Sequence, residues 1–386
     1  MANANLTSAR NAKQDEFYTQ YNDIQKEVNA YIDFDKDVFR DKTILLPCDD
    51  PEWSNFTKFF AQNFENFGIK KLISTSYAVE SKKLKYGREL SLFQDELFLS
   101  ARGIIEPTID KIKGKIFTLT RENYQVNYHN IKWSYLKGDG DFRSEEVKKL
   151  RDEADFVITN PPFSLFREFV AWIIEKNKKF LIIGSMNAIT YKEIFPFIKD
   201  NKLWLGATGF NTDMVFGVPN GTKIAPKDKE KAEKLGYEGN YTRLGNSCWF
   251  TNIDHGRRHQ PLKLMTMEDN IKFNKKLKGQ SYQKYDNYDA IEVPYTDAIP
   301  SDYDGVMGVP ISFLDKYCPE QFEIVSFRKG EDGKDLVFTR ERERESSTLL
   351  SYPCSTSIPG MIKNAEGKIN GRITYARITI KRISNQ

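Results

Sequence analysis

Residues 155–184 hold the pattern that most constrains the fold: an apolar strand, a rigid polar loop, an amphipathic helix and a second strand. Residues 155–159 predict a buried strand, residues 164–172 predict the helix, and residues 179–184 predict the next strand. The loop after the first strand reads Asn160, Pro161, Pro162, Phe163. Such a unit is typical of α/β enzymes, which carry their chemistry in loops at the carboxyl ends of strands.

The Asn-Pro-Pro-Phe loop suits methylation of an amine that is conjugated to a ring. The lone pair of such an amine is delocalised, so the nitrogen attacks only when acceptors hold both its hydrogens out of the ring plane. We predict the Asn160 side-chain oxygen and the Pro161 carbonyl as acceptors. Pro162 fixes the turn without adding an N–H, and Phe163 offers a face for a flipped-out base. In the alternative interpretation the loop only ends a strand, but the flanking elements favour the catalytic one.

Further strand patterns predict a mainly parallel α/β sheet. They lie at residues 42–47, 70–76, 203–206 and 247–253, and a helical pattern at 54–61 follows the first. We expect a catalytic domain over residues 1–255, with an insertion at about 81–130 and a solvated helix or loop within 221–240. Residues 256–386 are rich in turns, with strand-like runs at 321–327 and 372–380, and predict a smaller, more β-rich region.

Composition narrows the class of protein. The 386 residues contain no apolar run of about eighteen and no signal-peptide core at the start, so we expect a cytoplasmic protein without a membrane segment. Four scattered cysteines and three histidines argue against a structural metal. The net charge of +4 permits nucleic-acid binding without demanding it. Arg257 and Arg258, beside two histidines, are candidates for contact with phosphates, and a solvated loop is equally compatible with them.

The turn after the first predicted strand indicates the type of cofactor. It reads Cys48, Asp49, Asp50, Pro51, without a glycine fingerprint, and its two carboxylates would repel a pyrophosphate. This disfavours NAD and ATP. S-adenosylmethionine has no phosphate and carries an ammonium and a sulfonium, so it is compatible with carboxylates. The alternative is that Asp49 or Asp50 caps the next helix.

Two other segments are candidates for binding the donor. Asp141 and Phe142, within a Gly-Asp-rich turn, could hold an adenine ring through the carboxylate and the aromatic face; the alternative is a turn that closes a hairpin. Tyr18 and Thr19, ahead of the first strand, could close over the methionine end. For these two an ordinary amphipathic helix is the simpler interpretation.

Several strings together resemble the EcoRI-type adenine-specific DNA methyltransferases. They cover most of the chain and lie at residues 15–20, 48–51 with 54–56, 138–144, 159–166, 189–193, 284–291, 305–310 and 327–330. The resemblance implies a Rossmann-like fold that transfers a methyl group from S-adenosylmethionine to adenine N6 in duplex DNA after flipping the base. It makes residues 160–163 the catalytic loop and supports Tyr18, Thr19, Asp49, Asp141 and Phe142 as cofactor residues.

The resemblance also defines what stays open. Residues 256–386 become the target-recognition region, while extra residues at about 81–130 and 340–370 leave sequence specificity open. The biological role stays open between restriction protection, with a separately encoded endonuclease as companion, and solitary methylation; a monomer is favoured. The alternatives are an RNA or protein-glutamine methyltransferase, whose amine poses the same problem, and an inactive DNA-binding homologue, against which the intact loop argues.

Overall fold

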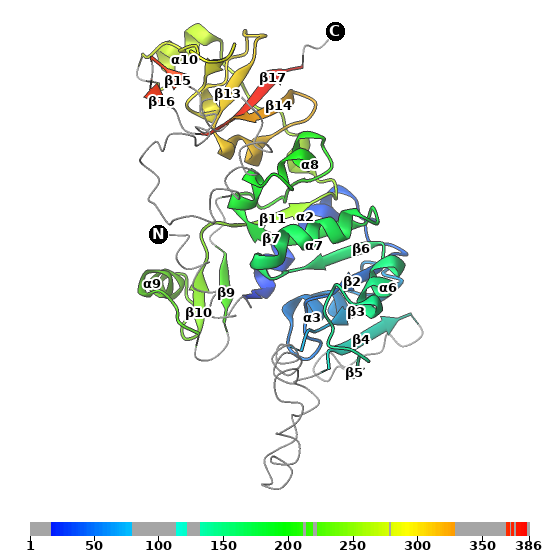
Figure 1. Cartoon of the computed structure of the whole chain (residues 1–386). Helices are drawn as coiled ribbons and strands as arrows, with labels where there is room; N and C mark the ends of the chain where they lie inside the picture. The colour runs from blue at the N-terminus through cyan, green and yellow to red at the C-terminus, as the bar shows by residue number, and fades with distance from the viewer. Residues whose placement is uncertain are drawn as a thin grey trace, which may run out of the picture. The chain divides into compact units, whose positions relative to one another are not determined.

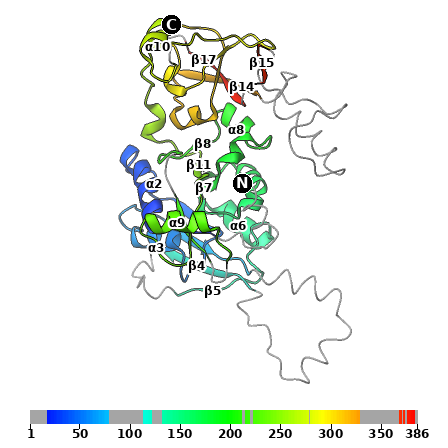
Figure 2. The same cartoon turned by 90° about the vertical axis from the view of Figure 1, so that its left-hand side faces the viewer.

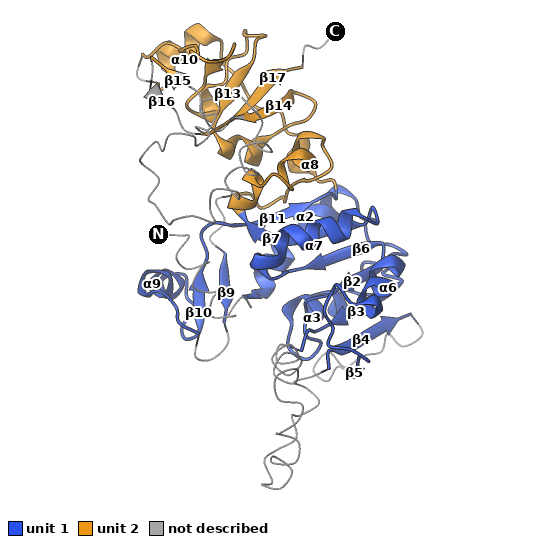
Figure 3. Cartoon of the chain, viewed as in Figure 1, with its two compact units in different colours: residues 1–185, 211–253 blue, residues 186–210, 254–386 orange. Residues whose placement is uncertain are grey.

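A computed structural model of the chain describes residues 17–78, 113–121, 132–210, 214–218, 222–277, 279–328, 368–370, 372–373 and 376–383. It divides into two compact units, shown in Figure 3: unit 1 comprises residues 1–185 and 211–253, and unit 2 comprises residues 186–210 and 254–386. Helices and strands occur in both, so the chain is of the α/β type. Most of the predicted insertion at 81–130 and of segment 340–370 lies outside the described residues. The division at residue 255 into catalytic and target-recognition domains stays a prediction.

The unit 1 strands of the main sheet follow the order β5-β4-β3-β2-β6-β7-β11, as Figure 1 shows. In the turned view of Figure 2, β4, β5, β7 and β11 are labelled. The strands in this part of the sheet are β2 (Thr43–Leu46), β3 (Lys71–Thr75), β4 (Lys115–Thr120), β5 (Ser134–Tyr135), β6 (Phe156–Thr159), β7 (Lys179–Ser185) and β11 (Ser247–Thr251). The predicted strands at 42–47, 70–76, 155–159, 179–184 and 247–253 are confirmed within two residues at each end.

The direction of the outer strands corrects the expectation of a mainly parallel sheet. β2 pairs in parallel with β3 and β6, and β6 with β7. On the flanks, β4 runs antiparallel to β3, β5 antiparallel to β4, and β11 antiparallel to β7. Antiparallel neighbours need no crossover helix between them. Because β4 is reversed, its first residue lies at the edge where β2, β3 and β6 end.

Helices cover both faces of this sheet. They are α2 (Tyr21–Phe34), α3 (Asn55–Gln62), α6 (Glu145–Glu153) and α7 (Phe166–Ile174). Along the buried strands successive side chains alternate between the faces. Ile158 and Leu181 join a core cluster with α2 and α3, whereas Gly184 of β7 leaves room for the Phe166 ring of α7, which a β-carbon there would overlap.

A smaller sheet in unit 1 has the order β1-β9-β10, with β1 (Tyr18–Thr19), β9 (Val215–Gly217) and β10 (Tyr241–Arg243). β1 replaces the amphipathic helix that was the simpler interpretation of this segment. Of the two alternatives for residues 221–240, a solvated helix or a loop, the structure has the helix: α9 (Pro226–Lys234), in which Ala232 is the only buried residue.

Unit 2 contains a sheet of order β12-β13-β17-β14 and a short β15-β16 hairpin. Among all the described residues of the chain, in either unit, no helix is long and apolar enough to cross a membrane.

The strands of unit 2 are β8 (Trp204–Leu205), β12 (Ile291–Glu292), β13 (Met307–Val309), β14 (Phe322–Arg328), β15 (Lys368–Ile369), β16 (Arg372–Ile373) and β17 (Arg377–Arg382). The helices are α8 (Phe195–Lys199) and α10 (Met267–Phe273), with 3-10 turns η3 (Met186–Thr190), η4 (Gly256–His259), η5 (Thr296–Ala298) and η6 (Ile311–Lys316).

Candidate active site

A cavity of about 420 Å³ opens in unit 1 at the edge where β2, β3 and β6 end and β4 begins. Its volume lies within the range of small-molecule sites. Seven of the residues proposed from the sequence for catalysis or cofactor binding line it: Tyr18, Thr19, Asp49, Asp141, Phe142, Asn160 and Pro162. Further lining residues include Phe17, Trp53, Asn55, Ser76, Tyr77, Lys115 and Arg143.

Asn160 follows the last residue of β6 and has its two side-chain heteroatoms in different environments. The amide nitrogen Nδ2 donates to the carbonyl oxygen of Phe17 at 2.6 Å and to the Thr19 hydroxyl at 3.3 Å. The oxygen Oδ1 is buried and has no hydrogen-bond partner among the described residues. A buried acceptor without a donor costs free energy unless a ligand supplies one. Asn160, which lines the cavity, therefore has one hydrogen-bond acceptor, Oδ1, that a ligand could engage.

The two prolines and the phenylalanine of the loop occupy different places. Pro161 is buried, and Pro162 lines the cavity and starts the 3-10 turn η2 (Phe163–Leu165). Phe163 is half-buried and is not a lining residue; its ring centroid lies 5.5 Å from that of Phe17. Phe163 is thus the last residue of the Asn-Pro-Pro-Phe loop, and its ring contacts that of Phe17.

Asp49 lies in the loop after β2 and is tied to two other segments. Its carboxylate accepts hydrogen bonds from the hydroxyls of Ser54 at 2.7 Å and Thr159 at 2.6 Å. Burial raises the pKa of Asp49 to about 7, although these two hydrogen bonds lower it. The cap of α3 is Ser54, which accepts from the backbone of Phe56 and Thr57. The alternative that an aspartate caps this helix is therefore wrong.

Asp50 faces a cation that the sequence interpretation missed. The Lys115 ammonium lies 3.5 Å from the Asp50 carboxylate, forms a shorter ion pair with Glu52, and lies 4.5 Å from the Trp133 ring centroid. Burial raises the pKa of Asp50, partly offset by Lys115. The signal for this cation was present at residues 115–120, where apolar and polar residues alternate as in a strand that starts at the lysine.

Asp141 and Phe142 lie side by side on the cavity wall with different partners. The Asp141 carboxylate accepts two hydrogen bonds from the Arg143 guanidinium, at 2.8 and 2.6 Å, and these raise the pKa of Arg143. The Phe142 ring is buried and packs edge-on against Phe169 and Trp172 of α7. The segment leads from β5 to α6 rather than closing a hairpin between paired strands, so that alternative is wrong.

Gly140 explains why this segment is rich in glycine. Its φ of +77° favours glycine, and a β-carbon there would overlap the carbonyl oxygen of Ser76. A β-carbon on Gly114 would collide with the same carbonyl. Three backbone segments therefore meet without side chains between them, and two of them, at Ser76 and Gly140, line the cavity.

Tyr18 and Thr19 form β1. The Tyr18 ring packs edge-on against Trp53 at 4.3 Å between centroids, and Trp53 keeps 44% of its surface exposed. The Asn55 side chain donates to the Thr19 carbonyl at 2.8 Å. The sequence analysis missed Trp53 and Asn55 as lining residues of the cavity. The signal that could have indicated them was the polar and aromatic composition of the segment after Asp50.

Arg257 and Arg258 lie in unit 2 and have internal partners. The Arg257 guanidinium pairs with Asp315 at 2.6 Å and donates to the carbonyl oxygen of Ala207. Arg258 is buried; its guanidinium stacks 3.7 Å from the Trp204 ring centroid. The alternative of a simple solvated loop therefore does not hold for Arg258.

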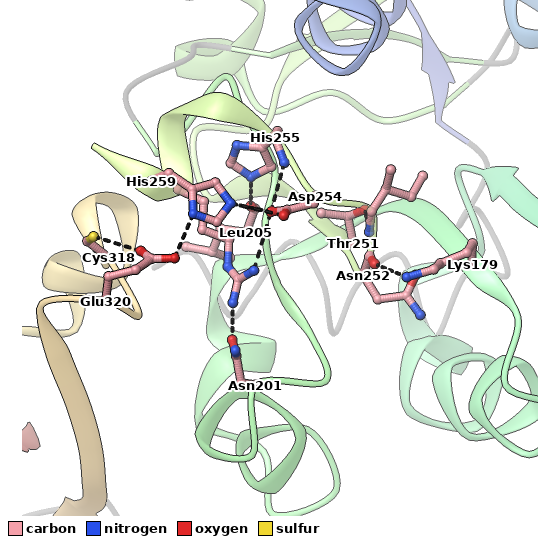
Figure 4. Close-up of polar contacts among 12 residues, drawn as sticks. Lys179, Asn201, Leu205, Thr251, Asn252, Asp254, His255, His259, Cys318 and Glu320 are labelled. Carbon is pink, nitrogen blue, oxygen red and sulfur yellow. Dashed lines mark hydrogen bonds and ion pairs between the residues drawn. The ribbon is translucent and has the colours of Figure 1, made fainter. Parts of the chain in front are cut away.

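Figure 4 shows polar contacts of residues close in sequence to these arginines, among them Asp254, His255 and His259 of unit 2. His259 bonds the Asp254 and Glu320 carboxylates through its two ring nitrogens, at 2.8 and 2.7 Å. The Arg258 guanidinium donates to the side-chain oxygen of Asn201. Across the described ranges no group of His, Cys, Asp and Glu side chains could hold a metal ion.

Comparisons with known proteins agree over nearly the whole chain. A family model described as adenine-specific methyltransferase EcoRI matches residues 5–383. The chain is 43% identical to the Type II methyltransferase M.EcoRI of Escherichia coli over 86% of its length and 91% of that relative. It is also 36% identical to the Type II methyltransferase M.MgeORF184P of Mycoplasma genitalium over 97% of both chains, and 31% identical to M.MpnI of Mycoplasma pneumoniae over 98% of both. No solved structure matches the chain significantly.

Proposed function

The chain belongs to the adenine-specific methyltransferase EcoRI family, and from that premise we propose that it transfers a methyl group from S-adenosylmethionine to N6 of a flipped-out adenine in a specific duplex sequence. The proposed catalytic fold is Rossmann-like and consists of the main sheet of unit 1 with its flanking helices. The adenine-specific DNA methyltransferase activity follows from the family; the donor, the base flipping and the residue roles are our proposal.

The observation that carries the mechanism is the buried Asn160 Oδ1 without a partner among the described residues. An adenine N6 placed against it would donate one hydrogen to Oδ1 and the other to the carbonyl oxygen of Pro161. With both hydrogens held out of the ring plane, the nitrogen lone pair turns toward the methyl group. Because an amide does not ionise, Asn160 aligns the amine and does not accept its proton; the proton that N6 loses after gaining the methyl group leaves to water. The rate enhancement therefore comes from alignment and hydrogen bonding.

The charges of the cavity fit the proposed donor, which when bound supplies an electrophilic methyl group on a sulfonium. Three carboxylates and two cations line the cavity. S-adenosylmethionine, with an ammonium, a sulfonium and a carboxylate, carries a net charge of about +1 that complements such a lining. A cofactor with a pyrophosphate would find no glycine-rich anion cradle after β2. Tyr18, Thr19, Asp49, Asp141 and Phe142 are the residues proposed to hold the donor.

The target base and the duplex need separate contacts. Flipping costs a few kcal/mol of stacking and pairing, which stacking of the base on Phe163 would offset in part. Sequence readout is proposed for residues after 206, and Arg257 and Arg258 remain candidates for phosphate contact, in competition with their internal partners. A monomeric state, a cytoplasmic location and a separately encoded endonuclease are further parts of the proposal.

One assay tests the reaction. The protein is incubated with labelled S-adenosylmethionine and, in parallel, with DNA, RNA or protein, and the modified position is mapped. We expect N6-methyladenine at one position of a short DNA sequence, and no transfer for Asn160→Ala, whose affinity for the donor stays within a few-fold of the wild type. Methylation of another acceptor, or normal turnover by Asn160→Ala, would contradict the proposal.

A further inference from the structure

The hydrogen-bond partners of the Asn160 amide determine which way its oxygen and nitrogen point. The oxygen and nitrogen of an asparagine side chain are nearly alike in size, so either could face a given neighbour. The neighbour of Asn160 is the carbonyl oxygen of Phe17, which can only accept. The atom at 2.6 Å from it must therefore be the NH2 group, and Oδ1 must point elsewhere.

The second hydrogen of that NH2 group is directed to the Thr19 hydroxyl oxygen at 3.3 Å. Both donors of the amide are then engaged by residues 17–19, and the buried Oδ1 is left without a partner among the described residues. We propose that Thr19, together with the carbonyl of Phe17, is a positioning element that holds Asn160 with its acceptor oxygen ready for the target amine. This inference rests on the proposed function, in which Oδ1 receives a hydrogen of adenine N6.

Contacts with β9 and α3 fix the position of the strand that carries Thr19. Thr19 is 4% exposed and pairs with Phe216 of β9, and its carbonyl accepts from Asn55 at the start of α3. The Phe17 ring packs against Phe216 with centroids 5.9 Å apart. A rotation of the Asn160 amide would break two hydrogen bonds to this strand and its preceding residue. The acceptor is thus fixed by residues far earlier in the sequence.

Thr19 also joins two parts of the site, because it lines the cavity proposed for the donor. A hydroxyl that accepts from Asn160 still has its own proton to donate. Removal of the hydroxyl is expected to loosen Asn160, and small misplacements of a catalytic group cost up to about 100-fold in rate. The effect should therefore appear in the methyl-transfer step even when donor and DNA are saturating.

The test compares Thr19→Val, which keeps the shape of the side chain and removes the hydroxyl, with Thr19→Ser, which keeps the hydroxyl. Thr251→Val is the matched control, since Thr251 is also a buried strand threonine of unit 1, and its hydroxyl donates to the Phe180 carbonyl away from the cavity. Single-turnover rates are measured with saturating donor and DNA. We expect the rate to fall by about 10-fold or more in Thr19→Val, to recover for the most part in Thr19→Ser, and to match the wild type in Thr251→Val.

A binding measurement provides a readout that is independent of turnover. Each protein is titrated with DNA that carries either adenine or unsubstituted purine, which lacks the amine, at the target position. The preference for adenine over purine should shrink in Thr19→Val relative to the wild type and Thr251→Val. A wild-type rate and an unchanged preference in Thr19→Val would overturn the positioning role. If the wild-type protein itself does not methylate adenine in DNA, the proposed function fails instead.

Discussion

The Thr159 hydroxyl donates a 2.6 Å hydrogen bond to the Asp49 carboxylate, and the bond joins the end of β6 to the loop after β2. Asp49 also accepts from Ser54, so both its oxygens are engaged within the protein. The residue that follows Thr159 is Asn160. Asp49 therefore fixes the start of loop 160–163, the proposed catalytic loop, and also lines the cavity. The sequence analysis predicted a cofactor role for Asp49 and not this contact with Thr159.

Asp49 should make stability depend on pH. Burial raises its pKa to about 7 from an ordinary value of 3.8, so between these pH values the folded state binds a proton that the unfolded chain has released. Its contribution to the free energy of unfolding must then fall as pH rises through that window. Asp49→Asn cannot titrate. The wild-type minus variant difference in unfolding free energy should decrease between about pH 5 and pH 8, by on the order of 2 kcal/mol at about 1.4 kcal/mol per pKa unit.

Urea denaturation of both proteins at several pH values across this range measures the difference, and the subtraction removes the contributions of other titrating groups. A difference that stays constant would show that the carboxyl is ionised throughout. Such a result would mean that the hydrogen bonds from Thr159 and Ser54 outweigh the effect of burial.

Gly140→Ala should destabilise the protein more than the same substitution at another glycine with a positive φ. The positive φ of Gly140 alone costs an alanine about 1 kcal/mol. Overlap of the new β-carbon with the Ser76 carbonyl adds to this. Gly236→Ala is the control, because its φ of +88° imposes a similar strain while nothing lies within 4 Å of its β-carbon.

We expect the melting temperature to fall further for Gly140→Ala than for Gly236→Ala, and the affinity for S-adenosylmethionine to weaken only in Gly140→Ala. Differential scanning calorimetry and isothermal titration measure the two quantities. Equal effects in both variants would mean that the backbone approach between Gly140 and Ser76 is not needed to shape the cavity.

The strands of the main sheet were predictable because burial on both faces leaves an unmistakable apolar run. β2, β6 and β7 have this character, and the polar residues that follow β2 and β6 were expected at one edge for that reason. β4 was missed because it lies within residues 81–130, a segment whose sequence as a whole has no clear period. Its reversed direction could not be predicted, since nothing local to the strand records which neighbour it pairs with.

Polar partnerships were the part of the site that the sequence did not reveal. Asp141 is predicted to hold the donor, and the sequence did not show that its carboxylate also accepts from Arg143, its near neighbour. Asp50 pairs with Lys115, and the contact between Asn160 and Phe17 spans 143 positions. Such contacts depend on the register of whole elements, which residue types and spacing do not determine.

Phe163→Ala should weaken capture of the flipped base. Removing one base-stacking face costs about 1–3 kcal/mol, and the neighbouring Phe17 ring would be left exposed on that side. DNA with 2-aminopurine at the target position reports flipping through its fluorescence. We expect a reduced amplitude for Phe163→Ala and a wild-type amplitude for Phe142→Leu, whose ring packs against α7 instead. Phe142→Leu should weaken donor binding. An unchanged amplitude in Phe163→Ala would remove this residue from the base site.

Substitution of Arg257 and of Arg258 should affect the salt dependence of DNA binding differently, because the two side chains have different internal partners. The Arg257 side chain is 31% exposed beside Asp315, whereas that of Arg258 is 7% exposed and stacks on Trp204. If Arg257 binds a DNA phosphate, Arg257→Gln should reduce the slope of log affinity for DNA against log salt concentration by about 1. Arg258→Gln should instead leave the slope unchanged and lower the melting temperature, because it removes the buried guanidinium that stacks on the Trp204 ring.

Filter binding between about 50 and 200 mM salt measures the slopes, with Lys229→Gln on the exposed helix α9 as the control for a change of one charge. If Arg257→Gln keeps the wild-type slope, the segment 256–259 makes no phosphate contact, and the basic surface of the recognition region must be sought elsewhere.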